Sequence, residues 1–198
     1  MTAIEAAQDV LKPVYAGYFA DPFVWGTKDA YYAIGTGQSE ADGGTEKAIN
    51  VFPMLRSRDF MTWEFIGHAL KRPDPSLGNN FWAPAVAESG GMFYLYYSVG
   101  HGDKDHQMRV AVSEAAGGPY EDTGTALIPL SKCAFAIDPH PFRDMDGRWY
   151  LFFAQDFLDL DSDARVGTAL VAARLDKMVK LGSEPVAVLR ARCKARRR

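Results

Sequence analysis

Two aspartates, each followed directly by proline, are the residues of this chain best suited to chemistry. Asp21 and Asp138 hold the same place in two similar stretches of sequence, and a third copy has Ala83 there, after Phe81 and Trp82. Paired carboxylates beside an aromatic face suit a carbohydrate, because one carboxylate can activate water, another can tune a neighbour's pKa, and a ring can stack on a sugar. Asp-Pro is also a common turn-opening dipeptide, so a purely structural role for both aspartates stays open.

The three stretches form a repeat that predicts the elements around these residues. Each copy has a short run around a proline, then a polar turn, then an aromatic run typical of a buried strand. The prolines of the three copies are 62 and 55 residues apart, at Pro22, Pro84 and Pro139. The aromatic runs that follow them span residues 30–35, 93–97 and 149–153. Helical periodicity is almost absent, which indicates an all-β chain.

Two further strand-like runs complete each copy, so every copy predicts four strands. A four-stranded unit that repeats at this interval is typical of a β-propeller blade, whereas a coincidental β-sandwich is the alternative. We therefore expect one partial propeller domain with blades at about 14–71, 79–130 and 134–190 and a basic tail at 190–198. Propellers close with about 4–8 blades. Three blades leave two apolar faces uncovered, so we expect either a homo-oligomer or a fragment.

Composition excludes several classes of function. The hydrophobic fraction of 47% and the charged fraction of 24% are typical of soluble globular proteins. No apolar run approaches the length of about 18 residues that spans a bilayer, and the first dozen residues do not resemble a secretory signal. We therefore expect a cytoplasmic protein with no membrane partner. Cys133 and Cys193 lie sixty residues apart, which excludes a disulfide framework.

Neither nucleic-acid binding nor metal binding is well supported. The net charge is −3, and six of the 22 basic residues fall in the last nine positions, which leaves an acidic body that is a poor partner for nucleic acid. The acidic loop 156–163 starts like a calcium loop, but Ala164 and Leu170 replace the required glycine and glutamate. The segment 101–106, which is rich in histidine and aspartate, looks like an exposed turn. We expect no metal and no cofactor.

Three motifs together resemble a known enzyme family. They are Gly-Tyr-Phe-Ala-Asp-Pro-Phe-Val at 17–24, Asn-Phe-Trp-Ala-Pro at 80–84 and Ala-Ile-Asp-Pro-His-Pro-Phe at 136–142. In this order they resemble glycoside hydrolase family 43, whose arabinofuranosidases, xylosidases and arabinanases are five-bladed β-propellers. The resemblance covers residues 14 to about 190. It implies an inverting hydrolase of α-L-arabinofuranosides or β-xylosides in plant polysaccharide fragments, without a choice between arabinose and xylose or between exo and endo action.

The resemblance also implies roles for individual residues. Asp21 would be the general base, and Asp138 would set the pKa and orientation of the general acid. Trp82 would line the sugar subsite, with Phe23 and His140 as its neighbours. The chemistry would need no cofactor and no metal.

One expected residue has no counterpart in the sequence. The family's general acid is a glutamate on the fourth blade, usually followed by Gly-Pro, and no Glu-Gly-Pro occurs here. Glu184 before Pro185 is the nearest lookalike, and we expect it at a strand edge. The resemblance therefore implies a glycosidase impaired by the lack of its general acid. The alternative is a non-catalytic carbohydrate-binding or assembly module, or an inactive fragment, and the basic tail suggests a truncated, frame-shifted or engineered end.

Overall fold

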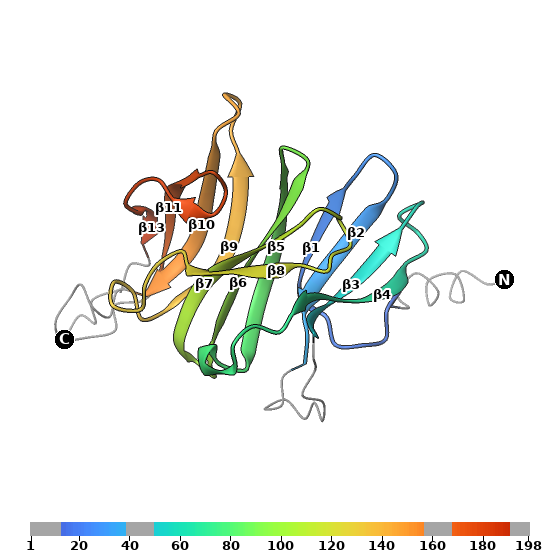
Figure 1. Cartoon of the computed structure of the whole chain (residues 1–198), viewed down its shortest axis with the longest axis horizontal. Helices are drawn as coiled ribbons and strands as arrows, with labels where there is room; N and C mark the ends of the chain where they lie inside the picture. The colour runs from blue at the N-terminus through green and yellow to red at the C-terminus, as the bar shows by residue number, and fades with distance from the viewer. Residues whose placement is uncertain (1–12, 39–49, 157–167, 191–198) are drawn as a thin grey trace, which may run out of the picture.

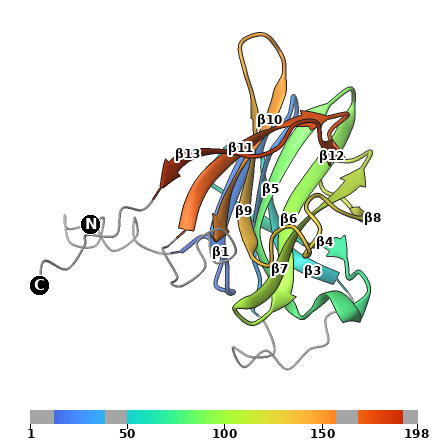
Figure 2. The same cartoon turned by 90° about the vertical axis from the view of Figure 1, so that its left-hand side faces the viewer.

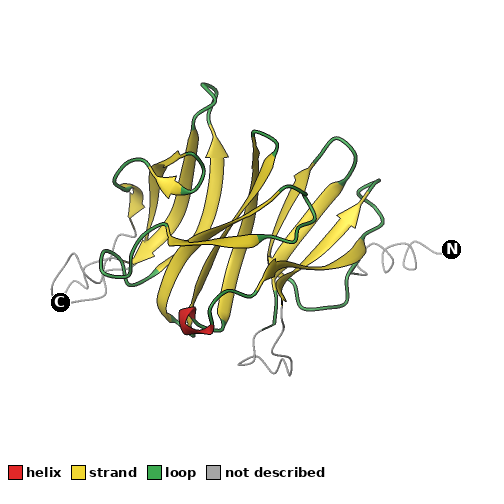
Figure 3. Cartoon of the chain, in the orientation of Figure 1, coloured by secondary structure: helices red, strands yellow, loops and turns green. Residues whose placement is uncertain are grey.

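The computed structural model describes residues 13–38, 50–156 and 168–190 of the 198-residue chain. These residues form β-strands and one short 3-10 helix, η2 at Pro75–Leu77 (Figure 3). In this part of the chain no helix has the length and apolar character needed to cross a bilayer. The prediction of an all-β chain is confirmed.

The strands form three antiparallel sheets that follow one another along the chain, and we call them blades 1, 2 and 3 (Figure 1). Blade 1 contains β1 (Ala20–Gly26), β2 (Tyr31–Thr36), β3 (Asn50–Ser57) and β4 (Glu64–Lys71). Blade 2 contains β5 (Asn80–Ser89), β6 (Met92–His101), β7 (Lys104–Ser113) and β8 (Glu121–Ala126). Blade 3 contains β9 (Ala136–Arg143), β10 (Trp149–Asp156), β11 (Thr168–Asp176), β12 (Lys180–Leu181) and β13 (Val186–Arg190).

A tight turn joins β5 and β6 at the polar segment between them. The β5–β6 hairpin pairs Ser89 with Met92, so its loop is Gly90 and Gly91 alone. Their φ values are 61° and 78°, and a two-residue turn with positive φ at both positions matches the twist of the strands it joins. Glycine reaches this conformation without a steric penalty, which explains the pair of glycines here.

Blade 2 is covered on both faces by its neighbours. Alternate residues of β6 point to opposite faces: Leu95 and Tyr97 join a core shared with blade 1, while Tyr96 joins a core shared with blade 3. All three side chains are fully buried. Among the large hydrophobic side chains that the described residues expose, none lies in β5–β8. This burial explains why the aromatic runs are apolar on both faces, as a stacked blade requires.

The first strands of the three blades lie next to one another. Strand β5 contacts both β1 and β9, and it runs between them in Figure 1. Figure 2, seen from the side of blade 3, shows blade 3 in front of blade 2 and blade 1 behind them. Residues at equivalent places in β1, β5 and β9 are therefore brought together, as the propeller repeat predicts.

Candidate functional site

The first strand of every blade has the same irregularity at the repeated proline. In each case the ladder to the second strand shifts register at this point, which is a β-bulge. The residue before the proline has positive φ in all three blades, with values of 47° at Asp21, 45° at Ala83 and 56° at Asp138. Positive φ is uncommon for residues other than glycine. The bulge therefore gives the two aspartates one shared geometry and turns their side chains out of the regular pleat.

The carboxylates of Asp21 and Asp138 lie close enough to influence each other. The surrounding protein withdraws Asp138 from part of its water, which raises its pKa, and the negative charge of Asp21 raises that pKa further. The Asp138 side chain still reaches solvent in this chain, which limits the effect. No described residue donates a hydrogen bond to Asp138. The structure thus brings together the two residues that the sequence placed at equivalent positions.

Asp21 has a hydrogen-bond partner, in contrast to Asp138. The hydroxyl of Thr36, at the end of β2, donates to Asp21 Oδ2 over 2.9 Å. The same hydroxyl oxygen accepts the backbone N–H of Ala83 over 2.9 Å. Thr36 is buried and Asp21 is exposed, so this link between blades 1 and 2 leads from the interior to a carboxylate that reaches solvent. The sequence patterns gave no role to Thr36.

Trp82 precedes the bulge of β5, and one face of its indole packs against the ring of His106. The two rings are stacked, with centroids 3.9 Å apart and planes 22° apart. His106 lies on β7 and is fully buried, so the expectation that segment 101–106 is an exposed turn is wrong for this residue. Its Nε2 donates to the carbonyl of Gly102 over 2.7 Å, and its Nδ1 has no partner among the described residues. Burial lowers the pKa of His106, so a neutral ring backs the indole.

Phe23 and His140 also meet between blades 1 and 3. Each lies two residues after the aspartate of its own blade, and their rings make an edge contact with centroids 6.0 Å apart. The equivalent residue of blade 2 is Ala85, whose small side chain is buried. Small residues at the repeated places of β5 thus allow the larger side chains of β1 and β9 to approach each other.

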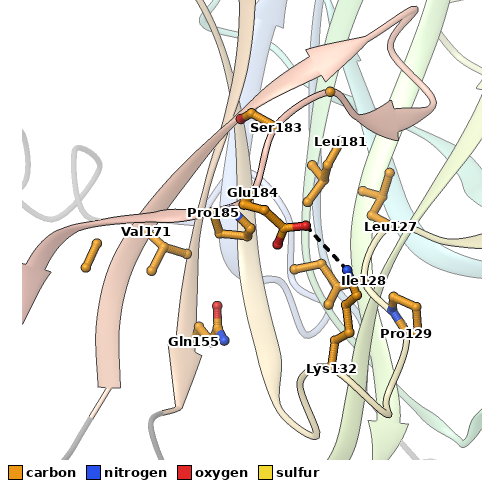
Figure 4. A pocket seen from close by; sticks show the side chains of 12 residues that line it. Leu127, Ile128, Pro129, Lys132, Gln155, Val171, Leu181, Ser183, Glu184 and Pro185 are labelled. Carbon is orange, nitrogen blue, oxygen red and sulfur yellow. Dashed lines mark hydrogen bonds and ion pairs between the residues drawn. The ribbon is translucent and has the colours of Figure 1, made fainter. Parts of the chain in front are cut away.

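A separate cavity of about 730 Å³ lies in blade 3, away from these residues (Figure 4). It is bounded by the segment after β8 and by the outer strands, and its lining includes neither aspartate of the inner strands. Glu184 lies there between β12 and β13, where its carboxylate contacts Lys132 Nζ at 3.4 Å and both side chains are largely exposed. The position of Glu184 agrees with the expected strand edge and not with a general acid beside Asp21.

Other expectations concern metals, thiols and the chain ends. Among the described residues, no group of three or more His, Cys, Asp or Glu side chains could hold a metal ion. Cys133 is buried and donates to the carbonyl of Phe135. Most of the calcium-like loop, Cys193 and the tail from residue 191 lie outside the described residues.

A comparison with protein families identifies the chain. The model for glycosyl hydrolases family 43 matches residues 10–196. The chain belongs to glycosyl hydrolase family 43. This family 43 chain is 30% identical over 143 residues to the extracellular endo-α-(1→5)-L-arabinanase 1 of Bacillus subtilis (strain 168), covering 67% of this chain and 42% of the arabinanase. It is 28% identical over 155 residues to the xylan 1,3-β-xylosidase of a Vibrio species, covering 72% of this chain and 26% of the xylosidase.

Solved structures agree with the family assignment at the level of the fold. The GH43_1 enzyme from Xanthomonas citri, complexed with xylose, superposes with a TM-score of 0.70 at 24% identity, and the match covers 89% of this chain and 57% of that one. The fold is therefore a β-propeller of the five-bladed glycosidase type, with three blades in this family 43 chain. The chain spans less than half the length of the two enzymes named above and little more than half of the solved one.

Proposed function

We propose that the bulges of β1, β5 and β9 form the water-activating part of a glycosidase site with an inverting mechanism. The observation that carries the proposal is the pair of aspartates, which share one backbone geometry and interact with each other while only Asp21 is held by a hydrogen bond. In this proposal Asp21 is the general base. Asp138 adjusts the proton affinity of the groups around it through its negative charge, which is coupled to that of Asp21.

The proposed reaction needs a base on one side of the sugar and an acid on the other. Asp21 takes a proton from water as the water oxygen bonds to the anomeric carbon, and the acid gives a proton to the departing glycosidic oxygen. In inverting enzymes these two carboxyl groups stand about 6.5–9.5 Å apart, which leaves room for the water. Trp82, held flat against His106, offers a face on which the sugar ring can stack.

We assign no general acid among the described residues. Glu184 is excluded from that role in our proposal by its exposed position and its contact with Lys132. General acid assistance contributes about 10²–10⁴-fold to such reactions. We therefore propose that the activity of this chain is impaired toward glycosides with poor leaving groups and is retained toward activated aryl glycosides.

The proposed substrates are α-L-arabinofuranosides or β-xylosides of plant polysaccharide fragments. One relative named above is an arabinanase, another is a xylosidase, and the similar solved enzyme holds xylose. These likenesses support a pentose substrate and do not choose between the two sugars. An experiment must therefore include both.

The test is hydrolysis of an aryl α-L-arabinofuranoside and an aryl β-xyloside by the chain and by its Asp21→Asn variant. We expect the variant to lose about 10²–10⁴-fold in kcat/KM toward the substrate that the wild type hydrolyses. Asp29→Asn is the matched control, because Asp29 lies in the exposed turn of the same β1–β2 hairpin. Equal activity of wild type and Asp21→Asn would show that Asp21 is not the base.

A second candidate function is a non-catalytic carbohydrate-binding or assembly module. It is favoured by the large hydrophobic side chains that blades 1 and 3 expose, among them Val24, Tyr31, Phe65, Phe142 and Val186. A homo-oligomer would cover such faces, because exposed apolar patches of this kind favour association. Light scattering tests the assembly, and a monomer at all concentrations would reject it. Binding of arabinose or xylose without hydrolysis by the wild type would favour the binding module over the glycosidase.

A further inference from the structure

One place on the second strand of each blade faces the start of the bulge. The residue at this place pairs with a residue of the first strand, the one directly before Asp21, Ala83 or Asp138. The pairs are Thr36 with Ala20, Ser98 with Trp82, and Ala154 with Ile137. Thr36, Ser98 and Ala154 therefore occupy equivalent places in the three blades, and each directly follows the aromatic run of its repeat.

In blade 1 this place holds a hydroxyl whose direction of donation is fixed. The N–H of Ala83 donates to Thr36 Oγ1, so the hydroxyl proton is free to go to Asp21 Oδ2. Ala83 can reach Thr36 because its positive φ turns its N–H out of the β5–β6 ladder. The strained backbone of blade 2 thus orients a side chain of blade 1.

Blade 3 has the same backbone geometry without this hydroxyl. Ala154 stands where blade 1 has Thr36, and its methyl group has no proton to give. No donor in the described chain reaches the carboxylate of Asp138. In blade 2 the hydroxyl of Ser98 donates instead to the carbonyl of Trp82 over 3.3 Å. Of the two aspartates, only Asp21 is held in one orientation.

We propose that Thr36 is a positioning residue that fixes Asp21 Oδ2 and leaves the second carboxylate oxygen to take a proton from water. The difference between Thr36 and Ala154 then decides which aspartate acts as the base. This inference rests on the proposed function, because it deepens the role given there to Asp21.

The test uses variants that remove the hydroxyl at position 36 or add one at position 154. Thr36→Ala removes the hydroxyl, Thr36→Ser keeps it, and Ala154→Ser adds one beside Asp138. Thr123→Val is the matched control, because the Thr123 hydroxyl donates to a backbone carbonyl in blade 2, outside the site. Thermal unfolding establishes that each variant is folded, and Thr36→Val replaces Thr36→Ala if the latter does not fold.

The first readout is the titration of the Asp138 carboxyl carbon by NMR, which needs no catalysis. Asp21→Asn removes the charge that raises the Asp138 pKa, so it sets the lower reference. We expect Thr36→Ala to lower the pKa of Asp138 part of the way, because a released Asp21 carboxylate turns to relieve the repulsion. Ala154→Ser should also lower it, by donating to the charged form. Thr36→Ser and Thr123→Val should titrate as the wild type does.

The second readout is hydrolysis of the aryl glycosides. We expect Thr36→Ala to lose roughly 10- to 100-fold in kcat with KM little changed, since misplaced catalytic groups cost rates of this order. Thr36→Ser should restore most of the loss. If Thr36→Ala matches the wild type in both readouts, or if Thr36→Ser fails as badly as Thr36→Ala, the proposal is wrong. A wild type that hydrolyses neither substrate rejects the proposed function, while the titration still decides whether Thr36 orients Asp21.

Discussion

Carboxylates in two regions of the molecule stand in opposite surroundings. Asp122, on the outer strand β8, accepts hydrogen bonds from Arg109 at 2.5 and 3.0 Å, from the Gly124 N–H at 2.7 Å and from the Tyr97 hydroxyl. On the inner strands, Asp21 accepts one from Thr36, and no described residue donates to Asp138. The chain therefore satisfies one carboxylate fully and leaves the inner pair largely open.

The pKa directions follow from this difference. Burial acts to raise the pKa of Asp122, but the hydrogen bonds from Arg109 and Tyr97 outweigh it and hold the pKa below its ordinary value. At Asp138, burial and the charge of Asp21 act in the same direction, so the pKa is raised. A satisfied carboxylate stabilises the fold, whereas an unsatisfied one remains available to water, protons or a ligand. The comparison thus separates a structural aspartate from chemical ones.

The largest effect is expected when the satisfied carboxylate loses its charge. Asp122→Asn leaves the Arg109 guanidinium, whose side chain is only 6% exposed, without its counter-charge. Removing one partner of a buried ion pair costs about 3–5 kcal/mol. Urea denaturation at pH 7 measures this loss, with Asp29→Asn as a surface control that should change stability little. A loss in the free energy of unfolding below about 1 kcal/mol would mean that Asp122 stabilises the fold no more than an ordinary surface ion pair does. The contrast between Asp122 and the inner aspartates would then not hold.

Most of the fold could be predicted from the sequence, because the repeat places the same strands three times. The departures are local. The run at 184–189, where the repeat predicts the fourth strand of blade 3, forms β13, which begins only at Val186. A two-residue strand that was not expected, β12, pairs with the end of β11 before it. Pro185 explains this start, since proline has no N–H to give to a ladder.

The candidate site was predictable only in part. Asp21 and Asp138 stand out because their position recurs directly before a proline, and Trp82 stands out as the aromatic residue next to the third copy of that position. The structure places the two aspartates together. Thr36 and His106 could not be found in this way. The N–H that donates to Thr36 comes from Ala83, 47 residues away, and this contact depends on the stacking of two blades and on the register, which the bulge of β5 shifts. A register that changes inside a strand cannot be inferred from alternation of side chains.

A smaller effect is expected from the backbone of the middle bulge. Ala83 has positive φ without the side-chain oxygen that makes this conformation easier for aspartate. Ala83→Gly should stabilise the chain by about 0.5–1 kcal/mol, because relief of strain exceeds the added flexibility of the unfolded chain. Urea denaturation measures this gain. Ala85→Gly is the control on the same strand and should destabilise, since Ala85 is buried and its φ is negative. Destabilisation by both variants would mean that the bulge at Ala83 carries no strain.

The smallest effect is expected in the pH dependence of stability. Its sign should differ between Asp138, on an inner strand, and Asp122, on an outer strand. Asp138 has a folded-state pKa above the ordinary aspartate value of 3.8, so the stability it contributes is present below that value and is lost as the pH rises through the folded pKa. Asp122 has a lowered pKa, so its contribution is present above 3.8 and is lost as the pH falls. At neutral pH the folded state therefore has the stabilisation from Asp122 and has lost the stabilisation from Asp138.

Asparagine does not titrate, so each variant removes the pH-dependent contribution of the aspartate that it replaces. At pH 7 the two variants should therefore differ from the wild type in stability with opposite signs. At pH 7 we expect Asp138→Asn to be more stable than the wild type by less than about 0.5 kcal/mol, since solvent screens a carboxylate at the surface. At pH 3 the difference should vanish, because Asp138 is then protonated and neutral. Asp122→Asn should be less stable than the wild type at pH 7, by an amount that shrinks on acidification. Urea midpoints at the two pH values measure both trends. An Asp138→Asn variant that is less stable at pH 7 would mean that Asp138 is held by favourable contacts, as Asp122 is, and that the inner carboxylates are not kept free for chemistry.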